Sequence, residues 1–398
     1  MAEMKRIRKT RRWKLHLFWY LTYTYFQNEH VLNSLVAKLK TLLSGAEDKF
    51  YEKRWSRVEV RKPIFIVAPH RTGTTILQHA LSFHSTIATP RTYSDLFDMF
   101  PILAERFLRP LFPGLSDRMV DRILVGRDTP QEAQGIVSRY FAKNYVAYNP
   151  TRAEDLFRYM RKLLYLDRGT RFLWKAPSVT SDLPEIAALF PDSQFIYIHR
   201  EPLVAVASKM KFIRIWQKMA FPASILYRHL VGKPSRKPKP VLGYFMDQAN
   251  RTVNLIRSRP DSREMTEDHL GCMENALTDL SVLHDPQRCC YLDYQALVDR
   301  PRDSLQKLLA FLGLPDETGR ILDRMQESGM PLREPEPSMD FLPRADRGRV
   351  RRKCGGRVQK MGRTINKKNW RLIGTAPSAS PAGGADKKPE ARSRSPRR

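Results

Sequence analysis

Short apolar runs that alternate with amphipathic stretches dominate the middle of the chain. Four such runs are rich in β-branched and aromatic residues, and they span residues 64–68, 171–175, 194–199 and 289–292. Continuous runs of this kind are typical of strands buried on both faces of a parallel sheet. Apolar residues recur at helical spacing between the runs, over residues 74–83, 182–189, 202–212 and 303–312. This alternation predicts an α/β fold with a central, mostly parallel sheet.

The remaining segments divide the chain into a main domain and flanking regions. Helical spacing covers much of residues 1–60 and also residues 95–112, 131–146, 153–165 and 241–258. Residues 232–240 are a Pro/Lys-rich loop, and residues 259–288 are expected to form a polar connector. We expect an N-terminal helical segment, a main domain, a C-terminal extension of that domain and a tail. Their expected bounds are 1–60, 61–318, 319–347 and 348–398, and the Pro/Ala/Ser/Arg-rich tail is predicted to be disordered.

Positive charge is concentrated at the two ends of the chain. The formal net charge is +29 over 398 residues. Residues 1–20 contain seven Lys/Arg against one acid, and residues 343–398 contain eighteen against three. Basic ends either bind nucleic acid or anionic lipid through counterion release, or remain solvated. We expect solvated ends here and no nucleic-acid partner.

The cysteines and the N-terminal stretch bear on localisation. Four cysteines form neither a disulfide framework nor a metal-binding spacing, which favours a reducing compartment. The apolar stretch Leu15 to Phe26 is shorter than the roughly 20 residues that cross a bilayer. It fits either a helix in the membrane interface, giving residues 1–30 a peripheral membrane contact, or a helix packed on the domain. No small-residue cleavage site marks a secretory signal. A cytoplasmic protein, with or without membrane association, is favoured over one in the Golgi lumen.

The segment IFIVAPHRTGTTILQHAL (residues 64–81) has the order strand, glycine-containing turn, helix. This order directs backbone N–H groups and a helix N-terminus at one point, which makes an anion site. The phosphate-binding loop of nucleotide kinases has a lysine where this chain has Thr74. Arg71 and the threonine hydroxyls suit instead one terminal phosphate or sulfate, held without an essential metal.

A second anion motif follows the third predicted strand, in FIYIHREPLVAVASKM (residues 195–210). Arg200 stands at the strand end and Ser208 lies about two helical turns later, so that both can face one ligand. In open α/β sheets, ligands bind beside the carboxyl ends of the strands. Taken alone, the same residues could be an ion pair between Arg200 and Glu201 at a helix start, with Ser208 uninvolved.

Together the two motifs resemble the sulfotransferases that use 3′-phosphoadenosine 5′-phosphosulfate, in particular their bacterial-type, broad-substrate branch. FLWKAPSVTSDLPEIAALFPDSQFIYIHR (residues 172–200) is similar to the family's Lys-x-Pro turn, helix and strand in that order. YLDYQALVDRPRDSLQKLLAFLGLP (residues 291–315) resembles its YEDL…P…FLGL segment. DTPQE (residues 128–132) is similar to its Pro-Gln-Glu segment. The resemblance covers about residues 60–318.

The resemblance implies a P-loop-like, three-layer α/β/α fold with helical insertions. It also implies sulfuryl transfer to a hydroxyl acceptor, with 3′-phosphoadenosine 5′-phosphosulfate as the donor and no metal. In the family the first loop holds the 5′-phosphosulfate and the second motif holds the 3′-phosphate. The matching residues are Arg71, Thr72, Gly73, Thr74 and Thr75 in the first motif and Arg200 and Ser208 in the second.

In-line sulfuryl transfer needs cations on the departing phosphate and a base for the acceptor hydroxyl. We expect Arg71 to stabilise the leaving group and Lys175 to reach the sulfuryl group from the other side. Relatives carry as base either a His, which has no counterpart here, or a Glu at the position where Ser94 stands. We rank Glu132 first and Asp95 second for this role. Glu132 could instead be a carboxylate favoured by a helix dipole, and Lys175 a strand-end lysine in a surface ion pair.

Three classes of function are compatible with these sequence features. The first is a sulfotransferase, and the second is a P-loop nucleotide kinase or NTPase, which the missing lysine disfavours. The third is a non-catalytic protein that binds polyanions through its basic termini. Aromatic residues in the predicted insertions, 95–165 and 214–290, suit a hydroxyl-bearing small molecule, lipid or glycan as acceptor, or else belong to the core.

Overall fold

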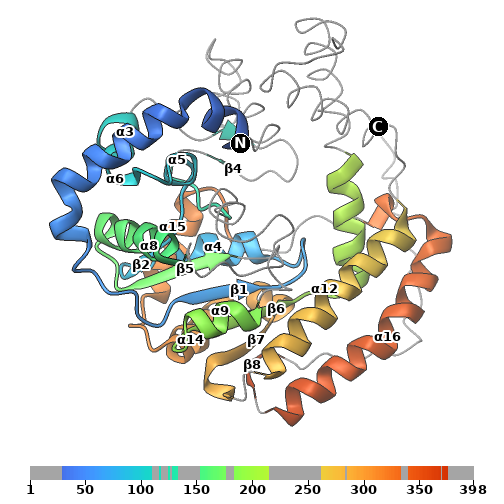
Figure 1. The fold of residues 1–398 in the computed structure, drawn as a ribbon. Helices are drawn as coiled ribbons and strands as arrows, with labels where there is room; N and C mark the ends of the chain where they lie inside the picture. Colours follow the sequence, from blue (N-terminus) through green and yellow to red (C-terminus); the bar gives the residue numbers. More distant parts are fainter. Residues whose placement is uncertain are drawn as a thin grey trace, which may run out of the picture.

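A six-stranded sheet forms the centre of the protein, and every strand pair in it is parallel (Figure 1). The computed structural model describes residues 29–109, 116–117, 124–125, 128–132, 153–175, 183–214, 261–282, 285–332, 339–368 and 370–374. The strands of the sheet are β1 (Ile64–Val67), β2 (Ile87–Ala88), β5 (Arg171–Lys175), β6 (Gln194–His199), β7 (Cys289–Asp293) and β8 (Arg371–Ile373). Their order across the sheet is β2-β5-β1-β6-β7-β8, and β3 (Ser116–Asp117) and β4 (Leu124–Val125) form a separate antiparallel pair.

Helices connect the strands and surround the sheet. The longer ones are α3 (Glu29–Trp55), α4 (Thr74–Leu81), α8 (Ala153–Asp167), α9 (Leu183–Leu189), residues 202–214, α12 (Ser262–Val282), α14 (Pro301–Leu312), α15 (Thr318–Glu327) and α16 (Arg344–Lys367). The shorter ones are α5 (Thr92–Leu96), α6 (Pro101–Leu103), α13 (Tyr294–Asp299), the π-helix η1 (Ala104–Leu108) and the 3₁₀ turns η5 (Pro286–Arg288) and η6 (Met339–Phe341). This arrangement confirms the predicted α/β class.

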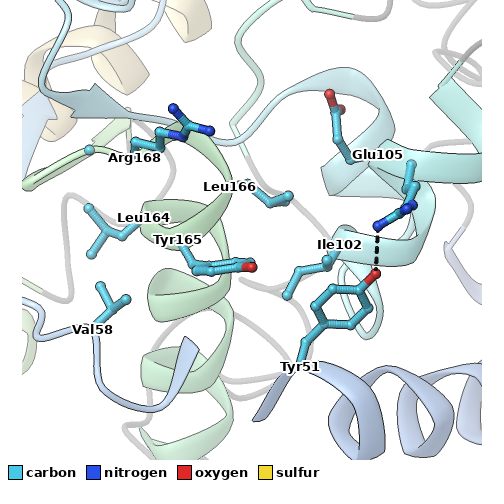
Figure 2. Close-up of a pocket in the computed structure, with 10 residues that line it drawn as sticks. Tyr51, Val58, Ile102, Glu105, Leu164, Tyr165, Leu166 and Arg168 are labelled. Carbon is cyan, nitrogen blue, oxygen red and sulfur yellow. Dashed lines mark hydrogen bonds between the residues drawn. The ribbon is translucent and has the colours of Figure 1, made fainter. Parts of the chain in front are cut away.

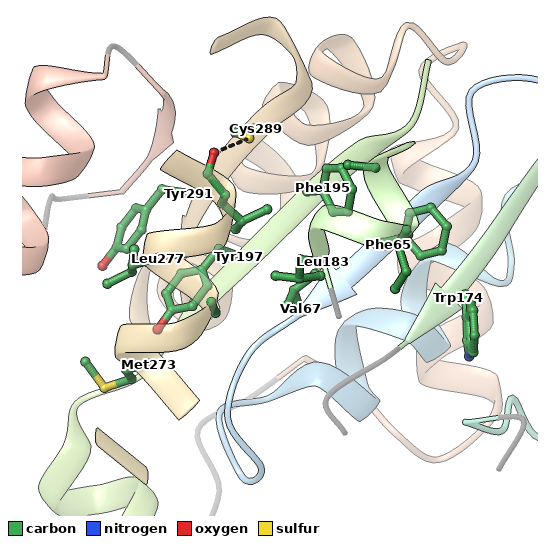
Figure 3. Close-up of a cluster of buried hydrophobic side chains, with 14 of the residues drawn as sticks. Phe65, Val67, Trp174, Leu183, Phe195, Tyr197, Met273, Leu277, Cys289 and Tyr291 are labelled. Atoms are coloured by element: carbon green, nitrogen blue, oxygen red, sulfur yellow. Dashed lines mark hydrogen bonds between the residues drawn. The ribbon is translucent and has the colours of Figure 1, made fainter. Parts of the chain in front are cut away.

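The strands are buried on both faces, as their continuous apolar sequences predict. On β1, Phe65 and Val67 point to one face, where the core includes residues from α8, α9, α12 and α16 (Figure 3). Ile64 and Ile66 point to the other face, where α4, α13, α14 and α15 supply the partners. Alternate side chains of a strand point to opposite faces, so this one short strand contributes side chains to both cores. The three-layer α/β/α architecture follows directly.

The register of the central strands aligns their carboxyl ends. Ile66 of β1 pairs with Lys175 at the end of β5, and Val67 pairs with Tyr197 of β6. On the next strand pair, His199 at the end of β6 lies opposite Asp293 at the end of β7. The loop after β1 is therefore flanked by the ends of β5 and β6.

Three expectations about segments outside these strands need correction. Residues 259–288, expected as a polar connector, contain the helix α12, which buries Leu270 and Met273 among other side chains. The helix α16 crosses the boundary expected at residue 348, and β8 follows it into the sheet. Residues 348–374 thus belong to the folded domain, because α16 buries a stripe of residues that its many basic residues obscure in the sequence: Val350, Cys354, Val358, Met361 and Ile365.

The helix expected over residues 95–112 is interrupted in the structure. The described part consists of α5, α6 and η1, with Pro101 at the first position of α6. Proline lacks the N–H that would continue a preceding helix, which accounts for the break there. The helix expected at residues 131–146 lies outside the described residues from residue 133 on. The helix expected at residues 241–258 and residues 1–28, with the predicted interfacial stretch, also lie outside them. No helix in the described part has the length and apolar content to cross a bilayer.

A buried cation ties α3 to α8. The Lys162 ammonium group on α8 is 1% exposed and lies 2.8 Å from a carboxylate oxygen of Glu47 and 2.9 Å from one of Asp48. It also donates to the carbonyl of Met99 at 3.2 Å and lies 5.2 Å from the ring centre of Trp55. Burial raises the pKa of Glu47, and the Lys162 charge opposes that rise. Each charge is tolerated because the other is present.

We expect Lys162→Met to lower the free energy of unfolding by about 3–5 kcal/mol, because it leaves the Glu47 carboxylate buried without its cation. The double variant Lys162→Met/Glu47→Gln should recover much of the loss. Urea unfolding of the full chain and of the three variants in a double-mutant cycle measures this coupling. Additive losses in the cycle would show that the two groups do not depend on one another.

Candidate functional site

The loop after β1 is held in a strained conformation that only certain residues permit. Arg71 has φ 72° and Gly73 has φ 104°, both in the left-handed region. A Cβ on Gly73 would lie 2.3 Å from the ring of Tyr294, so glycine is required by space as well as by backbone angle. The hydroxyl of Thr72 is buried and donates to the carbonyl of Pro69 at 2.8 Å, which fixes the turn from within. The helix α4 then begins at Thr74 with its first backbone N–H groups at the loop.

The second predicted motif contacts this loop directly. Arg71 donates from Nε to the hydroxyl of Ser208 at 3.2 Å, across 137 residues of sequence. Arg200 donates from Nη1 to the backbone carbonyl of Arg71 at 3.3 Å. The Arg71 guanidinium also lies 5.2 Å from the ring centre of Phe212, one turn beyond Ser208. Residues chosen separately as parts of two anion motifs thus form one continuous cationic site.

Lys175 completes the loop from the neighbouring strand. Its ammonium group donates to the hydroxyl of Thr75 at 2.8 Å and lies 2.5 Å from Oε1 of Glu132. The Lys175 side chain is 5% exposed and that of Glu132 is 27% exposed, so the carboxylate can be reached from outside. A lysine from β5 therefore contacts the loop that lacks a lysine of its own. The structure brings together Lys175, Thr75 and Glu132, three of the predicted site residues.

Several hydrogen bonds fix the segment that carries Glu132. Residues 128–132 lie against the segment after β2, where Arg91 and Pro130 form an antiparallel bridge. The side chain of Gln78 on α4 donates to the carbonyl of Gln131 at 2.9 Å. The indole of Trp174 donates to the carbonyl of Glu132 at 2.9 Å. The backbone on both sides of the Glu132 carboxylate is thereby tied to α4 and β5, the elements that build the loop.

The structure differs in what it describes at Ser94, which stands where relatives carry a Glu, and at Asp95, the second candidate for the base. Ser94, at the position where relatives carry a Glu, is fully buried, accepts from the backbone N–H of Arg91 at 2.8 Å and caps α5. Asp95 belongs to α5, but the placement of its side chain lies outside the described part. Of the two ranked carboxylates, Glu132 is the one whose side chain is described, and it meets Lys175.

Comparison with known proteins finds a family match over part of the chain. Residues 63–229 match the profile of the Sulfotransferase family. Residues 63–229 are a sulfotransferase-family segment. It contains the loop, Lys175, Glu132 and both residues of the second motif.

Individual relatives of the sulfotransferase-family segment come from mycobacteria. The chain is 25% identical over 279 residues to the omega-hydroxy-beta-dihydromenaquinone-9 sulfotransferase Stf3 of Mycobacterium bovis (strain ATCC BAA-935 / AF2122/97) and, with the same figures, to that of Mycobacterium tuberculosis (strain CDC 1551 / Oshkosh). These matches cover 64% of this chain, and the chain spans 63% of the length of these curated relatives. The crystal structure of sulfotransferase STF9 from Mycobacterium avium aligns with a TM-score of 0.49 at 13% identity, covering 84% of this chain and 83% of that one.

Two aromatic residues of the site were not predicted. Tyr294, at the start of α13, packs against Gly73 and lies 4.7 Å from the Arg200 guanidinium, and Phe212 stacks with Arg71. Phe212 was assigned to a helix, and Tyr294 falls in the segment similar to the family's YEDL pattern. Neither carries a sequence signal for its contacts, because these depend on how β7 and residues 202–214 lie beside the loop.

A cavity of about 610 Å³ lies elsewhere in the described part of the chain (Figure 2). It lies between α3, α6 with η1, and the end of α8, and includes Arg168 and Gly169 just before β5 begins. Lys175 stands at the opposite end of β5, and none of the residues that line the cavity belongs to the predicted site. The cavity is therefore separate from the predicted anion motifs. The described residues contain no group of three or more His, Cys, Asp or Glu arranged to hold a metal ion.

Two histidines behind the site are buried as neutral side chains. His199, the last residue of β6, is stacked at 5.9 Å on Tyr291, and burial lowers its pKa to about 4. His269 on α12 is 2% exposed, and burial, with the nearby His199 and Lys209, lowers its pKa to about 3. The unfolded chain takes up protons on both side chains near pH 6.5, whereas the folded chain does not. The stability they contribute is therefore present above that pH and is lost as the pH falls toward 4.

We expect the free energy of unfolding to fall between pH 6.5 and pH 4.5, by up to about 1.4 kcal/mol per pH unit for each neutral buried histidine. His269→Leu should weaken this dependence. The exposed Asn275 on the same helix offers a control, since Asn275→Leu should keep the pH dependence of the unchanged protein. Urea unfolding of the three proteins at several pH values measures how the free energy of unfolding of each depends on pH. Parallel curves for His269→Leu and the unchanged protein would contradict the expectation.

Proposed function

We propose that this protein transfers a sulfuryl group from 3′-phosphoadenosine 5′-phosphosulfate to the hydroxyl group of a lipid-like acceptor. The observation that carries the proposal is the contact between the two anion motifs, through the Arg71–Ser208 and Arg200–Arg71 hydrogen bonds. A donor with phosphate groups at both the 3′ and the 5′ position needs two such sites beside one another. The family match of residues 63–229 supports the same reaction.

The residues present fit this donor. The loop offers the N–H groups at the start of α4 and a glycine at the point where any Cβ would collide with Tyr294. Lys175 supplies the charge at the loop, and Arg200 with Ser208 supplies a cation and a hydroxyl at the second site. When bound, the donor supplies the sulfuryl group that is transferred.

The chain's own residues divide the remaining tasks. Glu132 takes the proton from the acceptor hydroxyl as the new oxygen–sulfur bond forms and the bond from sulfur to the phosphate oxygen breaks. Lys175 lies 2.5 Å from Oε1 of Glu132 and so holds that carboxylate at the loop before the transfer. Lys175 and Arg71 offset the negative charge that grows on the departing phosphate. Asp95 is the second candidate for the base.

The proposal of a lipid-like acceptor rests on the named relatives and on the N-terminal sequence. The mycobacterial relatives are named for an omega-hydroxylated dihydromenaquinone, a lipid alcohol. A lipid acceptor also agrees with the aromatic and basic N-terminal stretch of this chain, for which a peripheral membrane contact through residues 1–30 remains an expectation. A purely polyanion-binding protein has no need for the paired carboxylate and lysine at the loop, and a P-loop kinase would carry a lysine where Thr74 stands.

Donor binding is testable without knowing the acceptor. Calorimetry should detect adenosine 3′,5′-bisphosphate binding to the full chain in the presence of EDTA. Arg200→Ala and Ser208→Ala should each weaken it by about tenfold to a hundredfold, since each removes a hydrogen bond to a charged group. Arg302→Ala, an exposed arginine on α14, should leave it unchanged. Binding of ATP that requires magnesium, with none of the bisphosphate, would favour a nucleotide kinase instead.

The base can be assigned by comparing the two carboxylates. With a lipid alcohol as acceptor, Glu132→Gln should lower kcat by about 100-fold or more and remove the acidic limb of the pH–rate profile. Its affinity for adenosine 3′,5′-bisphosphate should stay within about twofold, because the carboxylate is not part of either anion site. Asp95→Asn serves as the matched comparison. Loss of the acidic limb in Asp95→Asn alone would transfer the role to Asp95.

A further inference from the structure

The ring of Tyr294 touches both anion sites. On one side it fills the space where a Gly73 side chain would sit, with Cδ2 and Cε2 at 2.3 and 2.4 Å from the position of that Cβ. It also supports the Arg200 guanidinium, which lies 4.7 Å from the ring centre. Gly73 belongs to the loop after β1 and Arg200 to the motif after β6, so a single buried side chain contacts both motifs.

The register of the sheet places Tyr294 at this point. β6 and β7 pair in parallel, with His199 opposite Asp293 as the last pair. The next residues along the two strands are Arg200 and Tyr294, which therefore leave the sheet side by side. The carboxylate of Asp293 accepts from the backbone N–H of Gln295 at 3.1 Å and caps α13, which fixes the first turn that carries the ring.

The residue itself departs from the family pattern. YLDY at residues 291–294 is similar to the YEDL segment, in which the fourth residue is a leucine. A leucine at this position could fill space beneath the loop but would offer no π face to a guanidinium. The aromatic support of Arg200 thus depends on the tyrosine that this chain has in place of leucine.

We propose that Tyr294 is a positioning residue that holds the two anion sites at a fixed separation, and that it thereby selects ligands with phosphate groups at both the 3′ and the 5′ position. The inference rests on the proposed function. A cation that is already oriented loses less conformational freedom on binding, so the second phosphate group is bound at lower cost. Loss of the ring removes one support of Arg200, whose hydrogen bond to the Arg71 carbonyl stays, while the loop keeps its own N–H groups at α4 and the contact with Lys175.

The experiment compares two nucleotides on the full chain. Adenosine 3′,5′-bisphosphate occupies both sites, whereas adenosine 5′-monophosphate has no 3′-phosphate for Arg200. In calorimetry, Tyr294→Leu should weaken bisphosphate binding about tenfold and monophosphate binding less than about twofold. Tyr294→Phe keeps the ring and should bind both nucleotides like the unchanged protein. In donor kinetics, Tyr294→Leu should raise KM for the donor and leave kcat nearly unchanged.

The outcomes separate the inference from the function on which it rests. If the unchanged protein prefers the bisphosphate and Tyr294→Leu keeps that preference in full, the positioning role is overturned and the proposed function stands. Equal weakening of both nucleotides would likewise overturn it, since that is the result of a merely structural role. If the unchanged protein binds neither nucleotide, both proposals fall. Tyr294→Met, which also lacks a ring, replaces Tyr294→Leu if the latter does not fold.

Discussion

The parallel pairing of β1 with both β5 and β6 is the constraint from which the site follows. Because the three strands run in the same direction and in register, they end at one edge of the sheet. Lys175, the loop after Val67 and Arg200 are therefore neighbours, although Arg71 of the loop and Arg200 are 129 residues apart along the chain. The cationic site needs no dedicated element of its own, since it is built from the points at which buried strands reach solvent.

This constraint also accounts for the lysine that the loop lacks. In a nucleotide kinase the loop itself carries the cation, one residue before its final hydroxyl. Here Thr74 takes that position, and the ammonium group of Lys175 contacts the hydroxyl of Thr75 from the adjacent strand. The ammonium group of Lys175 on β5 also meets the carboxylate of Glu132. The substitution thus couples the anion site to a carboxylate.

The sequence predicted these strands well because their physical signal is local. A run such as Ile64–Val67 must be buried on both faces, and its length and β-branched content are enough to identify it. The helix α16 was missed because its charged residues hide a stripe in which Val350 and Ile365 face the sheet. Tyr294 was missed for a different reason, since its contacts with Gly73 and Arg200 arise from the register between β6 and β7. The spacing of apolar and polar residues within one segment carries little information about the register between two strands.

The cations at the loop and the Glu132 carboxylate have different structural origins. Lys175 and Arg200 stand at strand ends whose positions the sheet fixes. Glu132 comes instead from residues 128–132, which lie outside the sheet and are held by Gln78 of α4, by Trp174 of β5 and by the bridge between Arg91 and Pro130. Changes in this segment can move the carboxylate while the registers of β5 and β6 stay as they are. In the proposed reaction, a fold of this kind can keep one donor and alter its acceptor, because the proposed base depends on an attached segment and the cations do not.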